Sequence, residues 1–147
     1  ALLAGVVAVA SISLAAALQA IDGIALKFMV DQWSAAAPEA RAVVFEAAFG
    51  VRQIEIGLAS LTGAFFGLTV ILYGVAILLS FVAPRWLGVF AVLGGAAVLT
   101  ASVVQAHAGF SDIAMTMTMP SILLVLLWCI GIGVFLLRSA GSVDQVE

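Results

Sequence analysis

The longest uncharged stretch of the chain, residues 56–84, reads "IGLASLTGAFFGLTVILYGVAILLSFVAP". An α-helix needs about 20 mainly apolar residues to cross the roughly 30 Å of hydrocarbon in a bilayer, and this stretch is longer than that. Three more uncharged stretches of sufficient length lie at residues 1–21, 86–111 and 113–137. The sequence therefore predicts an all-α integral membrane protein with four transmembrane helices.

The composition of the 147-residue chain agrees with this class. Hydrophobic residues make up 65% and charged residues 9% of it, against roughly 45–50% and 25% in a soluble domain. The formal charge is only −3 and the five Lys and Arg residues are scattered. No basic patch is available for nucleic acid, so we exclude nucleic acid as a partner.

The breaks between the apolar stretches predict where the helices end. Pro84 is expected to end the second helix, and Trp86 suits the headgroup level of the membrane. Because the connection between them is short, the second and third helices are expected to be antiparallel neighbours. Pro120 is expected in the first turn of the fourth helix, where proline is tolerated. We predict one up-down-up-down four-helix membrane domain at residues 1–138, with helices at about 1–33, 38–82, 86–107 and 120–138, and a polar tail at 139–147. A cleavable secretory signal is the alternative for the first helix.

Eight of the thirteen charged residues fall within residues 22–55. The first three of them lie in the segment "QAIDGIALKFMVDQW" (residues 19–33). About 20 helical residues at 1.5 Å each bring the first helix to the far interface near Asp22. We therefore expect the first two helices to extend beyond the bilayer as a polar hairpin, where charges are solvated at little cost. The hairpin residues singled out are Lys27, Asp31, Trp33 and Glu46.

A smaller set of polar residues is expected where this hairpin leaves the lipid. Gln19 and Asp22 share a helix face, as do Arg52 and Glu55. His107, the single histidine, is expected at the same height. Two interpretations stay open: the charges lock the hairpin as a partly buried set, or they line a polar mouth that binds a headgroup or transfers protons.

The segment "MTMTMP" (residues 115–120) offers soft ligands. Thioethers together with an imidazole suit Cu(I), and alternate spacing would place Met115, Met117 and Met119 on one side of an extended strand. Methionine is also common where irregular apolar surface is filled. A chain with one Cys and one His cannot build a tetrahedral zinc site. We predict no metal and no cofactor, with these methionines and His107 as the copper candidates.

Small residues recur along one stripe of the second helix and along one stripe of the third. Such stripes let helix backbones approach closely inside a membrane. We expect the two helices to pack on each other here, with a dimer face as the alternative. The stripes contain Gly63, Gly67 and Gly74 on the second helix, and Gly88, Ala91, Gly95 and Ser102 on the third.

Two phrases, "AIDGIALKFMVDQW" (residues 20–33) and "VRQIEIG" (residues 51–57), are similar to those of small, alanine-rich, multi-helix bacterial membrane proteins. The families concerned are described only as domains of unknown function. The resemblance covers the first helix and the start of the second, about a third of the chain. It implies no activity and transfers no catalytic residue.

The predicted function is a non-enzymatic membrane binding or accessory protein, which holds a lipid, an apolar ligand or a partner subunit at the outer mouth. The motivating feature is an apolar flank on the hairpin, residues 43–45 and Phe49. The alternatives are a small proton-coupled carrier that uses Asp22 and Glu55, and a lipid-modifying enzyme. The partners expected are membrane lipids, and a larger membrane complex or a homodimer.

Orientation depends on the distribution of Lys and Arg between the two faces. Arg85 and Arg138 share one face with the N-terminus, whereas Lys27, Arg41 and Arg52 share the other. A plain count favours the second face as cytoplasmic, but Lys27 and Arg52 are bracketed by acids and are poor topology signals. We expect a bacterial inner-membrane protein with both termini cytoplasmic.

Overall fold

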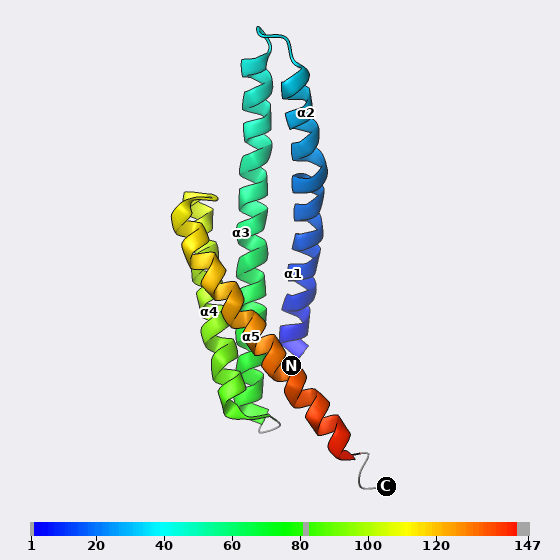
Figure 1. The fold of residues 1–147 in the computed structure, drawn as a ribbon, viewed down its shortest axis with the longest axis vertical. Coiled ribbons are helices and arrows are strands. Elements are labelled where there is room, and N and C mark those ends of the chain that lie inside the picture. The colour runs from blue at the N-terminus through cyan, green and yellow to red at the C-terminus, as the bar shows by residue number, and fades with distance from the viewer. Residues whose placement is uncertain (1, 81–82, 144–147) are drawn as a thin grey trace.

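The structure is a computed structural model that describes residues 2–80 and 83–143, with side chains through residue 139. Every element is helical: α1 (Leu2–Ala20), the π-helix η1 (Ile21–Leu26), α2 (Lys27–Ala35), α3 (Arg41–Ser80), α4 (Arg85–Ala108) and α5 (Asp112–Val143), as Figure 1 shows.

Four of the helical stretches are long and apolar enough to cross a membrane. They are Leu2–Ala35 (34 residues), Arg41–Ser80 (40 residues), Arg85–Ala108 (24 residues) and Asp112–Ser139 (28 residues). The first of them combines α1, η1 and α2 in one helix without a break. The prediction of an all-α protein with four long apolar helices is confirmed, and these features suggest an integral membrane protein.

Helix α3 is the central element of the fold. It packs against α1, η1 and α2 on one side and most extensively against α4, which in turn packs against α5. Helix α5 runs obliquely to the others and diverges at its C-terminal end, while α2 and the first turns of α3 stand above the α4–α5 turn (Figure 1).

The α3–α4 contact is made by the two predicted stripes of small residues. A Cβ atom added to Gly67 would lie 2.7 Å from the carbonyl oxygen of Gly95, and one added to Gly74 would lie 2.8 Å from that of Gly88. At the upper end of the contact, a Cβ on Gly63 would collide with the Ser102 hydroxyl. The two backbones therefore touch, and the prediction that these stripes face each other is confirmed.

Helix α1 meets α3 through few polar contacts. The buried Ser11 hydroxyl donates to the carbonyl oxygen of Thr62 over 3.4 Å. Because α1 and α3 run antiparallel (Figure 1), eleven residues beyond Ser11 the chain reaches Asp22 in η1, and eleven residues before Thr62 it is at Val51 in α3. This places η1 beside the part of α3 that holds Arg52.

The predicted start of the fourth helix is wrong. Helix α5 begins at Asp112, eight residues before Pro120, which lies inside the helix. The Ser111 hydroxyl accepts a hydrogen bond from the Ala114 N–H at 3.4 Å, and the Asp112 carboxylate complements the dipole of the first turn. These two residues supply a start signal, and a membrane helix tolerates an internal proline.

Two other boundaries differ from prediction. Helix α3 begins at Arg41 instead of residue 38, because residues 38–40 form a turn in which the Ala40 N–H donates to the Ala37 carbonyl at 2.9 Å. Helix α5 continues to Val143 through most of the predicted polar tail, and residues 144–147 lie outside the described residues.

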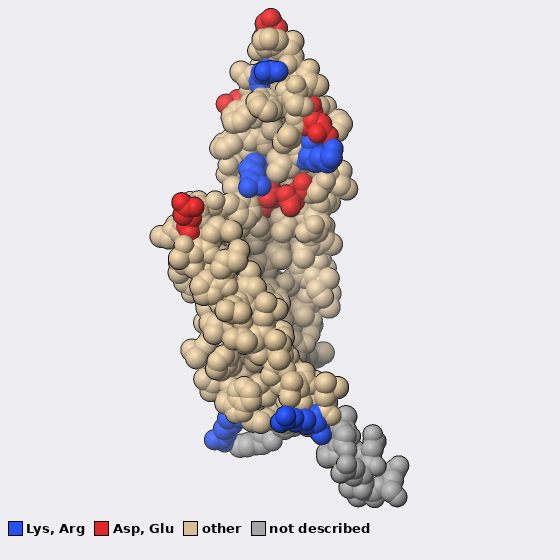
Figure 2. All heavy atoms as spheres, viewed as in Figure 1, with Lys and Arg blue, Asp and Glu red and all other residues tan. Residues whose placement is uncertain are grey.

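The described charges gather at the two ends of the molecule and leave an uncharged band between them (Figure 2). The lower end carries Arg85, at the start of α4, and Arg138, near the end of α5. Three basic and six acidic residues lie towards the upper end, in residues 22–55 and at Asp112. An uncharged band with charged ends is the pattern expected of helices that pass through hydrocarbon.

Candidate functional site

The candidate site lies on α3 where η1 and the α4–α5 turn both approach it. Its centre is an ion pair between Arg52 and Glu55, one helical turn apart, in which Arg52 Nη1 lies 2.8 Å from Oε1 and 2.6 Å from Oε2 of Glu55. The Glu55 side chain is only 5% exposed, whereas that of Arg52 is 41% exposed. The carboxylate is therefore buried behind a guanidinium group that reaches the surface.

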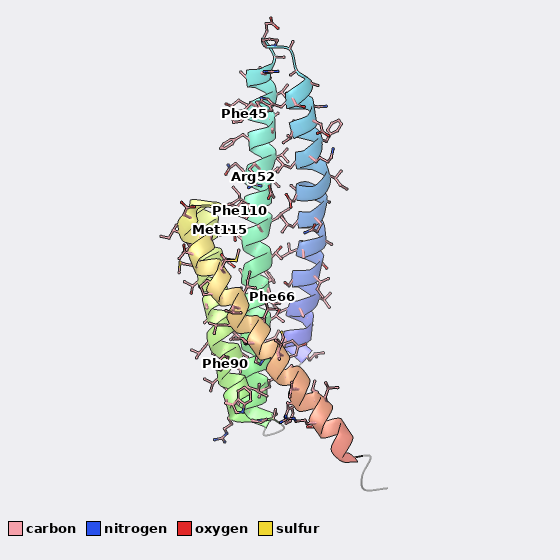
Figure 3. All side chains as sticks on the ribbon, in the orientation of Figure 1. Phe45, Arg52, Phe66, Phe90, Phe110 and Met115 are labelled. Carbon is pink, nitrogen blue, oxygen red and sulfur yellow. The ribbon has the colours of Figure 1, made fainter. Side chains whose placement is uncertain are left out.

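Phe110, in the α4–α5 turn, holds the outer side of Arg52. The Arg52 Cζ atom lies 4.6 Å from the centroid of the Phe110 ring, which is cation–π geometry. Figure 3 shows both residues at the junction of α3 with this turn. The contact ties this part of α3 to the α4–α5 turn.

Gly109 is the residue that makes this contact possible. It ends α4 with a φ of +63°, a conformation that residues with a side chain rarely adopt. Its N–H donates to the Gln105 carbonyl at 2.8 Å, and a Cβ added to it would lie 3.5 Å from Ile56 of α3. The tight turn thus lies against α3 next to the ion pair.

Asp22 and Gln19 do not join the pair. Both side chains are exposed, and Asp22 makes no ion pair with any described residue. The π-helix begins at Ile21 and changes the register of the helix at this point. The predicted Asp22–Arg52–Glu55 set is therefore reduced in the structure to Arg52 and Glu55.

His107 lies in the last turn of α4, where its side chain is exposed. Its Nδ1 atom is 2.9 Å from the carbonyl oxygen of Val103, so an N–H at that position bonds within its own helix. This contact anchors the ring on the backbone at a helix end.

The four hairpin residues singled out from the sequence are all exposed: Lys27, Asp31 and Trp33 on α2 and Glu46 on α3. Lys27 and Asp31 form an ion pair whose side chains are 71% and 60% exposed. This pair lies at the protein surface, unlike the buried carboxylate of Glu55.

The copper candidates are not arranged as predicted. Residues 115–119 are helical instead of extended, so alternate residues point to different sides. Met115, Met117 and Met119 are each exposed. Among the described residues, no group of three or more His, Cys, Asp or Glu side chains could hold a metal ion.

The Arg52 guanidinium has hydrogen-bond donors that its ion pair does not use. Arg52 uses Nη1 for Glu55, and its Nε and Nη2 groups have no acceptor among the described residues. A partly exposed guanidinium with spare donors can bind a carboxylate, a phosphate or a carbonyl oxygen.

Phe110 is the site residue that the sequence did not reveal. Its only signal was an aromatic side chain next to a glycine in a turn.

Four long apolar helices with an uncharged band between charged ends suggest a small helical integral membrane protein. The chain belongs to the DUF4386 family, a domain of unknown function whose family model matches residues 1–139. This confirms the resemblance inferred from the sequence and extends it from about a third of the chain to nearly all of it. Comparisons with curated proteins and with solved structures give no match.

Proposed function

We propose that this protein is a non-enzymatic membrane accessory protein whose upper hairpin, residues 27–50, extends beyond the bilayer and holds a partner subunit. The length of α3 supports the extension. Its 40 residues span about 60 Å at 1.5 Å per residue, twice the roughly 30 Å of hydrocarbon in a bilayer. The 24 residues of α4, in contrast, span about 36 Å, close to that thickness.

The observation that carries the proposal is the apolar surface of this charged hairpin. Phe45 and Phe49 are each 51% exposed and Val43 is 73% exposed, next to the exposed charges of Arg41 and Glu46. The two phenylalanine rings stack with centroids 6.3 Å apart. Apolar residues clustered on a surface that also carries charges are typical of a protein–protein contact.

The base of the hairpin is suited to hold it in one position. Arg52 bonds to Glu55 within α3 and stacks on Phe110 from the α4–α5 turn. A fixed hairpin loses less conformational freedom on binding than a mobile one, which favours affinity.

The same ion pairs bear on orientation. Lys27 and Arg52 are each paired with an acid one turn along their own helix and are weak topology signals. Arg41 is the other basic residue at the upper end, and the lower end carries Arg85 and Arg138. The positive-inside rule then favours a cytoplasmic lower end, with both termini on that side.

Site-specific photo-crosslinking in native membranes tests the proposal. A photoreactive residue at Phe45 should give a defined adduct with one partner protein. The same residue at Ala47, exposed two positions along α3 and on another side of the helix, should not. The variant Phe45→Glu/Phe49→Glu should lose the partner during gentle purification. A bare monomer in native mass spectrometry, with no adduct from Phe45, would contradict the proposal.

The buried Glu55 carboxylate favours a second candidate, a proton-coupled carrier. Glu55 is the one charged residue that is buried among the described residues, and buried ionisable groups in membrane proteins commonly serve transport. Proton flux into proteoliposomes should then disappear in Glu55→Gln and fall in Asp22→Asn. Equal flux in liposomes with and without the protein would remove this candidate.

A further inference from the structure

A groove opens between the lower parts of α3 and α5, where α5 diverges from its neighbours. Its volume is about 730 Å³, within the range of sites that hold small molecules. The side chains that form it are largely apolar and include Tyr73, Ala76 and Ile77 of α3 and Trp128, Ile132 and Phe135 of α5.

A second hollow of about 320 Å³ adjoins the groove at the lower end of the molecule, between the start of α4 and the end of α5. It is lined by Trp86, Phe135 and Arg138, among others. Phe135 lines both spaces, so one side of α5 leads from the apolar groove to the Arg138 side chain. Trp86 is 58% exposed, as tryptophans are at the headgroup level of a membrane.

The charge at this end has one sign among the described residues. Arg85 and Arg138 lie there, and the six described acids all lie towards the upper end (Figure 2). The two remaining acids of the chain, Asp144 and Glu147, are outside the described residues. An apolar groove with a cationic rim complements a molecule that has a hydrocarbon chain and an anionic head.

We propose that this groove binds an anionic phospholipid, with one acyl chain between α3 and α5 and the phosphate at Arg138. A second copy of the chain explains the features less well. In the same membrane orientation it would bring its own arginines to Arg138, because its described acids lie at the other end. The lipid site is independent of the hairpin function, since the two lie at opposite ends of the molecule.

The test is native mass spectrometry of the full chain from nanodiscs that contain equal amounts of phosphatidylglycerol and phosphatidylcholine. We expect one phosphatidylglycerol to be retained in preference to phosphatidylcholine. Because one arginine near a membrane surface contributes on the order of a fivefold preference for an anionic lipid, Arg138→Gln should reduce the ratio by about fivefold. Arg138→Lys should keep it, and Arg41→Gln at the upper end should leave it unchanged.

Filling the groove provides a second, charge-independent test. Ala76→Phe, on the groove wall, should abolish retention of the lipid, whereas Val75→Phe, at the preceding residue of α3 and outside the groove lining, should not. Equal retention of the two lipids by the parent would overturn the proposal. So would unchanged phosphatidylglycerol retention in both Arg138→Gln and Ala76→Phe, or a lipid-free dimer that Ala76→Phe dissociates.

Discussion

Arg52 and Lys27 each pair with an acid about one turn further along the helix, and the two pairs differ in burial. The Glu55 carboxylate is buried, whereas Asp31 is 60% exposed. Breaking a buried pair costs about 3–5 kcal/mol, and a solvated pair is worth about 0–1 kcal/mol. Because Arg52 is itself 41% exposed, we expect Arg52→Leu to cost about 2–3 kcal/mol of stability, between these limits.

Thermal unfolding in a mild detergent measures this difference. Arg52→Leu should lower the midpoint clearly, and Lys27→Leu, which breaks the exposed pair, should hardly change it. The double variant Arg52→Leu/Glu55→Leu should recover much of the loss, because it removes the buried carboxylate as well. Equal midpoints for the two single variants would show that Glu55 is solvated.

Among the individual residues of the site, the sequence predicted the Arg52–Glu55 pair and missed Phe110, its aromatic neighbour. Three-residue spacing places two side chains on one helix face whatever surrounds the helix, so that pair could be inferred. Phe110 reaches Arg52 only because Gly109 reverses the chain against α3. Asp22 was misplaced because a π-helical turn leaves no mark in the apolar pattern.

At the scale of the elements, the α3–α4 contact depends on glycine. A Cβ on Gly67 would lie 2.7 Å from the Gly95 carbonyl oxygen and 2.9 Å from the Leu99 nitrogen, both backbone atoms that cannot move aside. Gly67→Ala should therefore separate the helices and cost about 1–3 kcal/mol, as overpacking does. The measurement is the unfolding midpoint in detergent.

Gly57→Ala is the matched control on the same helix. A Cβ on Gly57 would meet nothing within 4 Å, so alanine should leave stability unchanged or raise it by up to about 1 kcal/mol through its better helix propensity. If Gly67→Ala unfolds at the same temperature as Gly57→Ala, the helices do not touch at Gly67.

Pro120 distinguishes the observed start of α5 from the predicted one. Inside a helix, proline leaves the carbonyl oxygen of Thr116 without its N–H donor. Pro120→Ala should supply that donor and stabilise the helix by about 1–3 kcal/mol. The unfolding midpoint in detergent should rise accordingly. An unchanged midpoint would favour a helix that begins at Pro120, where the missing N–H has no cost.

Helix number, the packing stripes and the start of α4 could be predicted, and the start of α5 could not. Four uncharged stretches, each long enough as a helix to cross the hydrocarbon of a bilayer, can be recognised from composition alone. The true start of α5 depends on the hydrogen bond from the Ala114 N–H to the Ser111 hydroxyl, and a Ser-Asp pair also occurs in loops. Pro120 therefore gave the stronger but misleading signal.

For the whole molecule, the oblique path of α5 could not be predicted from the sequence. Lipid tails are as apolar as a protein core, so the hydrophobic pattern of a transmembrane helix does not show which face packs on protein. Leu126, Leu127 and Ile130 of α5 are at least half exposed, although any of them would suit a core. The groove between α3 and α5 exists because of this divergence.

We propose that the chain crosses the membrane four times and that its α2–α3 hairpin extends from one side of the membrane. The most direct test of this proposal is labelling with a membrane-impermeant maleimide, in a Cys129→Ala background, of single cysteines at Ala36, Ala47 and Arg85. We predict that Ala36→Cys and Ala47→Cys react from one side, and Arg85→Cys only from the other. Reaction of Ala36→Cys and Arg85→Cys from the same side would contradict the topology, and a protected Ala47→Cys would contradict the extended hairpin.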